Sequence, residues 1–68
     1  MAVTKLIELI ANSAKSWEDA TRQAVHEASK TLYNIRSVSI REQCAVVEHG
    51  QITSYQVTVE LSFEIEDS

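Results

Sequence analysis

The chain has 68 residues, a formal net charge of −4 and 44% hydrophobic residues, with one cysteine, one glycine and no proline. This length predicts a single domain over residues 1–68 with little interior, so we expect association with other chains to supply further burial. The acidic balance and the scattered lysines and arginines argue against a nucleic acid or an anionic membrane as partner.

The N-terminal apolar run is interrupted by Lys5 and Glu8, which argues against a signal peptide. No apolar stretch approaches the ~18 residues that a membrane-spanning helix needs. The single cysteine, Cys44, excludes an intrachain disulfide and fits a reducing compartment. We therefore expect a cytoplasmic protein in which Cys44 is a small strand residue.

The first predicted elements are a strand over residues 3–10, a polar connector over 12–15 and a helix over 16–33. The strand has apolar side chains on both faces. Ser16 is the expected N-cap of the helix, and Asn34 can take the left-handed conformation that ends one. The helix presents a narrow packing stripe suited to lying close against a sheet, with Trp17 at its start and Ala20, Ala24 and Ala28 at its centre.

Two further strands are predicted over residues 35–47 and 52–65, joined by a hairpin turn at Gly50. In the second strand an apolar row at even positions is interrupted by Glu42; the row is Val38, Ile40, Cys44 and Val46. The last strand alternates more clearly, with Gln56 on its polar face. Its apolar face comprises Tyr55, Val57, Val59, Leu61, Phe63 and Ile65.

The element order β-α-β-β predicts an α+β fold with a three-stranded sheet against one helix. A right-handed crossover makes the first and second strands parallel, and the third strand fits between them, antiparallel to both. The hairpin strands would be about 40 Å long or more, whereas the helix would cover only about 27 Å. Apolar residues near the turn, such as Val46 and Ile52, would then need cover from another subunit. We predict an obligate oligomer.

The sequence does not support an enzyme. It has no glycine-rich phosphate loop and no CxxC motif, and its two histidines, His26 and His49, are expected on a helix surface and in a turn. Two residues remain as candidates. The amide of Gln56 could pair with a planar heterocycle, although it also fits a plain surface glutamine. Glu42 could join symmetry copies around a cation, or could simply be exposed at a sheet edge.

The chain resembles the dodecin family over nearly its whole length. The resemblance is carried by three collinear stretches: residues 16–20 (SWEDA), 28–35 (ASKTLYNI) and 55–65 (YQVTVELSFEI). It implies a hollow homododecamer of 23 symmetry, in which each sheet wraps its helix and which in many members stores flavin.

In flavin-binding dodecins, isoalloxazine rings stack between tryptophans at the start of the second strand, and a glutamine of the third strand bonds the ring edge. Gln56 matches that glutamine, whereas Ser37 occupies the tryptophan position. Losing an aromatic stacking partner costs roughly 0.5–1.5 kcal/mol beyond area burial, so weaker binding or a different ligand is expected. Arg36 and Arg41 are further candidates to line the site, which would take riboflavin or FMN.

The tryptophan-lacking chain is also similar to dodecins that are associated with calcium. By that resemblance Glu42 corresponds to an acidic position near the three-fold channels, where three copies could hold hydrated Mg²⁺ or Ca²⁺. A shell with weak or no flavin binding is therefore the alternative function. The family also includes members that bind coenzyme A, for which no residues can be assigned in this chain.

Overall fold

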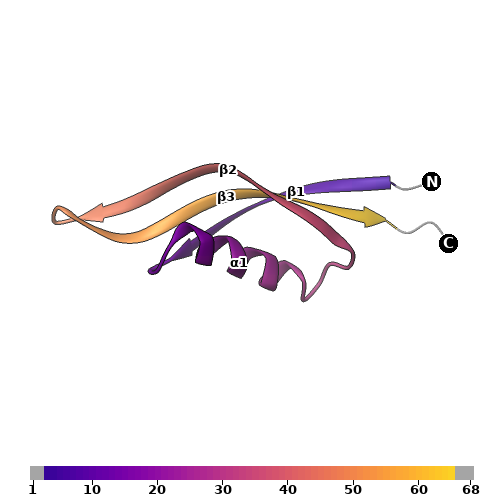
Figure 1. Ribbon diagram of the computed structural model, residues 1–68, viewed down its shortest axis with the longest axis horizontal. Coiled ribbons are helices and arrows are strands. Elements are labelled where there is room, and N and C mark those ends of the chain that lie inside the picture. The colour runs from indigo at the N-terminus through magenta and orange to yellow at the C-terminus, as the bar shows by residue number, and fades with distance from the viewer. Residues whose placement is uncertain (1–2, 66–68) are drawn as a thin grey trace.

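The computed structural model describes residues 3–65 and has the predicted order β-α-β-β (Figure 1). Strand β1 spans Val3–Ser13, helix α1 Trp17–Ala28, strand β2 Ile35–Glu48 and strand β3 Gln51–Ile65. The sheet order is β1-β3-β2, and β3 is antiparallel to both neighbours. The predicted central position of the last strand is thus confirmed.

The core lies between α1 and β3. The buried side chains that meet there are small or β-branched, so the helix approaches the sheet closely. Trp17, Leu9 and Ala11 pack around this centre. The predicted alanine stripe and apolar strand face are confirmed, since the buried apolar residues are Ala20, Ala24, Ala28, Val57, Val59 and Leu61.

The helix is shorter than predicted, because it ends at Ala28 and not at Tyr33. The Ser29 hydroxyl donates to the Val25 carbonyl at 2.7 Å. The backbone amide of Lys30 then donates to the carbonyl of Glu27, three residues earlier, and no longer to the carbonyl four residues earlier. Side-chain hydrogen bonds to backbone carbonyls, and a last turn with the tighter three-residue hydrogen bonds, are common where a helix ends. Asn34 does take the expected left-handed conformation, with φ 61°, but in the loop before β2.

The first strand is longer than predicted and runs through Ser13, so its last residues lie inside the ladder with β3. The hairpin turn lies at Gly50 as predicted, and it is tighter than the predicted strand ends imply, with two residues between β2 and β3. His49 and Gly50 both have positive φ, at 51° and 75°, which is the geometry of the tight turn that suits twisted strands.

The helix leaves much of the sheet uncovered, as Figure 1 shows for the hairpin end that extends well beyond α1. The described residues extend 54 Å along the longest axis, whereas twelve helical residues cover about 18 Å. Val38 and Ile40 pair with the buried Leu61 and Val59 on the helix-side face, yet they are 38% and 47% exposed. The predicted mismatch between helix and sheet is confirmed. Within residues 3–65, no helix is long and apolar enough to span a membrane.

Candidate functional site

Gln56 projects from the central strand on the face of the sheet that points away from α1. Its neighbours Tyr55 and Val57 face the helix, and alternation along β3 turns the amide to the other side. Gln56 is half-buried, although α1 does not cover this face. We refer to it below as the open face of the sheet.

Gln56 is the middle residue of a row that crosses all three strands. Asn12 of β1 lies directly opposite it on one side, and Cys44 of β2 lies opposite it on the other. Residues paired across antiparallel strands share a face and have Cβ atoms about 4.5–5.5 Å apart. Asn12 and Cys44 are both exposed, so the row presents two amides and a thiol on the open face.

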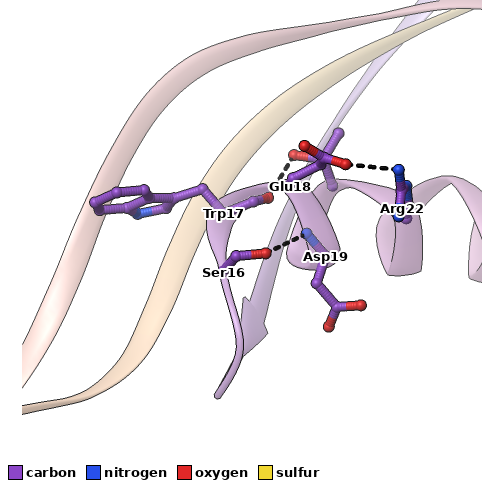
Figure 2. Close-up of polar contacts among 6 residues, drawn as sticks. Ser16, Trp17, Glu18, Asp19 and Arg22 are labelled. Carbon is purple, nitrogen blue, oxygen red and sulfur yellow. Dashed lines mark hydrogen bonds and ion pairs between the residues drawn. The ribbon is translucent and has the colours of Figure 1, made fainter.

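The N-terminal end of α1 contacts the β2 side of this row through Trp17, whose indole extends from the start of the helix toward the neighbouring strands (Figure 2). Nε1 of Trp17 donates a 2.8 Å hydrogen bond to the carbonyl of Cys44. The indole also meets the ring of Tyr55 edge to face, with centroids 5.0 Å apart and planes at 75°. Ser16 begins the helix by accepting the Asp19 amide at 2.9 Å, as its predicted N-cap role requires. Trp17 is therefore a packing residue that links the helix to both hairpin strands.

Ser37 lies on the open face but far from Gln56 in the same chain. It pairs with Ser62, and the two hydroxyls form a hydrogen bond. Ser62 is six residues beyond Gln56, which corresponds to about 20 Å along a strand. Ser37 also borders a shallow hollow of 180 Å³ beside Val25 and Ile35, and Gln56 does not line it. One chain therefore does not bring the two residues to a common ligand.

Arg36 and Arg41 are each placed where β2 carries an extra residue relative to β3, because the register shifts between Ile35 and Ser37 and again between Ile40 and Glu42. Arg36 holds Glu64 through Nε and Nη2 at 3.0 and 2.9 Å. Nη1 of Arg41 lies 3.9 Å from Glu60. Both arginines are exposed, so these contacts are weak and leave the guanidinium groups accessible.

Glu42 does not interrupt an apolar row, and this correction follows from the irregularity at Arg41. One extra residue reverses the alternation, so the pairing of Ile40 with Val59 gives way to that of Glu42 with Thr58. Glu42 and Cys44 consequently share the open face with Gln56, whereas Ile40 is on the helix side. Glu42 is exposed and makes no side-chain hydrogen bond or ion pair with residues 3–65.

The described residues of one chain contain no group of three or more His, Cys, Asp or Glu side chains that could hold a metal ion. A cation at Glu42 would therefore need carboxylates from several copies of the chain. Oxygen ligands of this kind suit Ca²⁺ or Mg²⁺.

The sequence pattern does not reveal Asn12 as a neighbour of Gln56, because residues 12–15 have the composition of a polar connector. The available signal was weak. Asn12 is two residues after Ile10, so it would lie on the same face as Ile10 if the first strand continued through it. The strand ends later because β3 offers backbone partners as far as Tyr55, which pairs with Ser13. Tertiary pairing outweighs the low strand propensity of asparagine and serine here.

Comparison with known proteins gives a consistent result. The family model described as Dodecin matches residues 3–66. Calcium dodecin of Mycobacterium tuberculosis is 34% identical over 65 residues, covering 96% of this chain and 92% of the relative. The dodecin of Thermus thermophilus is 29% identical over 66 residues, covering 97% and 96%.

Solved structures agree with the fold. A point mutant of the T. thermophilus dodecin superimposes with a TM-score of 0.93 at 28% identity, with both chains covered fully. Dodecin from Streptomyces coelicolor gives 0.92 at 28% identity, covering 98% and 96%. The M. tuberculosis calcium dodecin, described as calcium-chelating with a novel calcium-binding site, gives 0.82 at 36% identity, covering 97% and 94%.

Proposed function

Because this chain belongs to the dodecin family, we propose that it is a cytoplasmic protein that binds and stores a flavin, riboflavin or FMN. Binding takes place at contacts between subunits of a hollow homododecamer of 23 symmetry. The protein acts by holding its ligand and not by catalysis.

The observation that carries this proposal is the position of Gln56. The amide stands on the uncovered face of the central strand, half-buried between two polar neighbours. A carboxamide offers a donor and an acceptor side by side, which matches the imide edge of a flavin. This is also the position at which the resemblance to flavin-binding dodecins expects the ring-bonding glutamine.

The separation of Ser37 from Gln56 supports a site built from more than one copy. The two residues share a face but lie about 20 Å apart along the strands, farther than one isoalloxazine ring reaches. A flavin bonded to Gln56 of one subunit would meet the start of β2 only in another subunit. Arg36 and Arg41, accessible on the same strand, would then line the ligand's polar substituents.

The uncovered apolar surface supports the assembly itself. Val38 and Ile40 on the helix side and Leu6 and Ile10 on the open face all remain exposed in one chain. Side chains of this size on both faces of a small domain mark surfaces that other subunits cover.

The test is a native mass spectrum of the protein as purified, followed by a riboflavin titration read by quenching of ligand fluorescence. We expect twelve subunits and saturable binding that Gln56→Ala weakens. Gln43→Ala is the matched control, because Gln43 pairs with Val57 and so lies on the opposite face. A monomer would contradict the assembly, and undiminished riboflavin uptake by Gln56→Ala would contradict the assigned site.

The second candidate is a dodecameric shell that binds Ca²⁺ or Mg²⁺ through Glu42. The similarity to a calcium dodecin favours it, together with the exposed Glu42 carboxylate and Ser37 at the stacking position. Ca²⁺ should then raise the thermal midpoint of the parent and not that of Glu42→Gln. Glu48→Gln at the hairpin end is the matched control, and equal Ca²⁺ responses in all three proteins would remove this candidate.

A further inference from the structure

Gln56 alone cannot pair with the whole hydrogen-bonding edge of a flavin. The row formed by Asn12, Gln56 and Cys44 offers further hydrogen-bonding groups beside it. The pyrimidine edge of a flavin presents a carbonyl, an N–H and a second carbonyl in line. One carboxamide can satisfy the N–H and one carbonyl, since it offers one acceptor group and one donor group on its bonding edge. The second carbonyl then needs a donor from a neighbouring residue.

Within residues 3–65, Asn12 and Cys44 are the residues that pair with Gln56 across the neighbouring strands, and they differ in donor strength. Cys44 offers a thiol, which is a weak donor. Asn12 offers an amide, which is a stronger donor. Because Asn12 and Gln56 are paired across antiparallel strands, their Cβ atoms are about 5 Å apart, so both amides can reach the same ligand edge. Of the two cross-strand partners, the stronger donor is therefore Asn12, on the β1 side.

The position of Asn12 is fixed by the residue that follows it. Ser13 is buried on the helix side, where its hydroxyl donates to Asp19 at 2.6 Å and accepts the Lys15 amide at 2.9 Å. Because alternate strand residues point to opposite faces, anchoring Ser13 toward the helix directs Asn12 to the open face. The other end of the row is held by the bond from Trp17 to the Cys44 carbonyl.

We propose that Asn12 is a second ligand-binding amide of the Gln56 site, donating to the carbonyl of the pyrimidine edge that Gln56 leaves unpaired. This inference rests on the flavin-binding function proposed above. The beginning of α1 anchors both ends of the row, so the two amides are arranged before the ligand arrives, and little ordering is needed on binding.

The test is a riboflavin titration of the assembled protein and its Asn12 variants. Asn12→Ala should raise Kd about 5- to 150-fold, the size expected when a carbonyl loses its partner in a covered site. Asn12→Asp should weaken binding at least as much, since a carboxylate cannot donate and repels the carbonyl oxygen. Asn12→Gln keeps the amide and should retain more affinity than Asn12→Ala. Thr4→Ala is the control, because Thr4 is on the same strand and face but pairs with Glu64.

A second measurement separates a direct contact from a structural effect. The carbonyl stretching bands of bound riboflavin in the infrared should move to higher frequency in Asn12→Ala and stay in place in Thr4→Ala. If the parent binds riboflavin and Gln56→Ala weakens it, unchanged affinity and unchanged bands in the Asn12 variants would overturn this inference alone. A parent that binds no riboflavin would overturn the proposed function and this inference together.

Discussion

The hydroxyl of Ser13 donates a 2.6 Å hydrogen bond to Oδ2 of Asp19, joining the end of β1 to the first turn of α1. The amide of Gln23 donates to the same oxygen at 2.6 Å. These two hydrogen bonds, with Lys15 and Arg22 nearby, hold the pKa of Asp19 below its ordinary value. The ionised carboxylate therefore helps to close the turn between strand and helix.

A pH dependence follows, because a carboxyl with a lowered folded-state pKa stabilises the fold while it is ionised. The stabilisation is fully present above the ordinary Asp value of 3.8 and is lost as the pH falls through the lower pKa of the folded state. Asp19→Asn should lower the thermal midpoint at pH 7, and the difference from the parent should shrink toward pH 2. Circular dichroism melts across this range measure it.

The control for that series is Glu18→Gln, which breaks the exposed ion pair with Arg22. Exposed pairs of this type contribute a few tenths of a kcal/mol, so little change is expected. A midpoint difference for Asp19→Asn that stays constant from pH 7 to pH 2 would show that charge on Asp19 is not the cause.

A second prediction concerns the indole of Trp17. Trp17→Phe keeps an aromatic ring near Tyr55 but removes the donor to the Cys44 carbonyl. The free energy of unfolding should fall by about 0.5–1.5 kcal/mol, the usual net contribution of one hydrogen bond. Amide hydrogen exchange should quicken around Cys44 more than at the beginning of β2.

Tyr33→Phe provides the comparison for Trp17→Phe, because Tyr33 is 80% exposed and loses only a hydroxyl. It should leave both stability and exchange unchanged. Uniformly faster exchange over the whole of β2 in Trp17→Phe would mean that Trp17 acts through general packing and not through the Cys44 carbonyl.

Strand β3 and its two faces could be predicted from the sequence, because polar and apolar residues alternate without a break from Tyr55 to Ile65. The faces of β2 could not, although its ends were placed within a residue. The extra residues at Arg36 and Arg41 shift the register against β3, and neither glycine nor proline marks them. An unbroken two-residue period therefore assigned Glu42 and Cys44 to the face of Ile40.

The positions of the candidate site residues could be predicted in part for the same reason. Gln56 belongs to the regular strand, so its face and central position followed from pattern alone. Asn12 depends on how far β1 continues beside β3, and the bond from Trp17 to Cys44 joins residues 27 apart in the chain. Such contacts depend on register and tertiary packing, which local propensity does not contain.

A third prediction tests assembly through Ile40. Its side chain shares the helix-side face with the core but is 47% exposed in one chain. On a monomer, Ile40→Lys would be a surface change of about 0.5 kcal/mol or less. In a dodecamer it would place a charge in a covered contact, and native mass spectrometry should show smaller species. His26→Lys, on the exposed side of α1, should leave the subunit number unchanged, and intact dodecamers of Ile40→Lys would contradict the proposed role of this surface.

The last prediction concerns Ser37, which by the resemblance to flavin-binding dodecins occupies the position of their tryptophan. If Ser37 of one subunit faces the ring held by Gln56 of another, Ser37→Trp should restore a stacking surface worth roughly 0.5–1.5 kcal/mol, or about a 2- to 12-fold lower riboflavin Kd. Ser39→Trp is the matched control, because Ser39 pairs with Glu60 on the same face two residues along β2. Riboflavin titration of both variants should show tighter binding only for Ser37→Trp, with quenching of ligand fluorescence by the new indole. Equal gains in the two variants would indicate nonspecific stacking on the open face, and a gain in neither would place the ligand away from the beginning of β2.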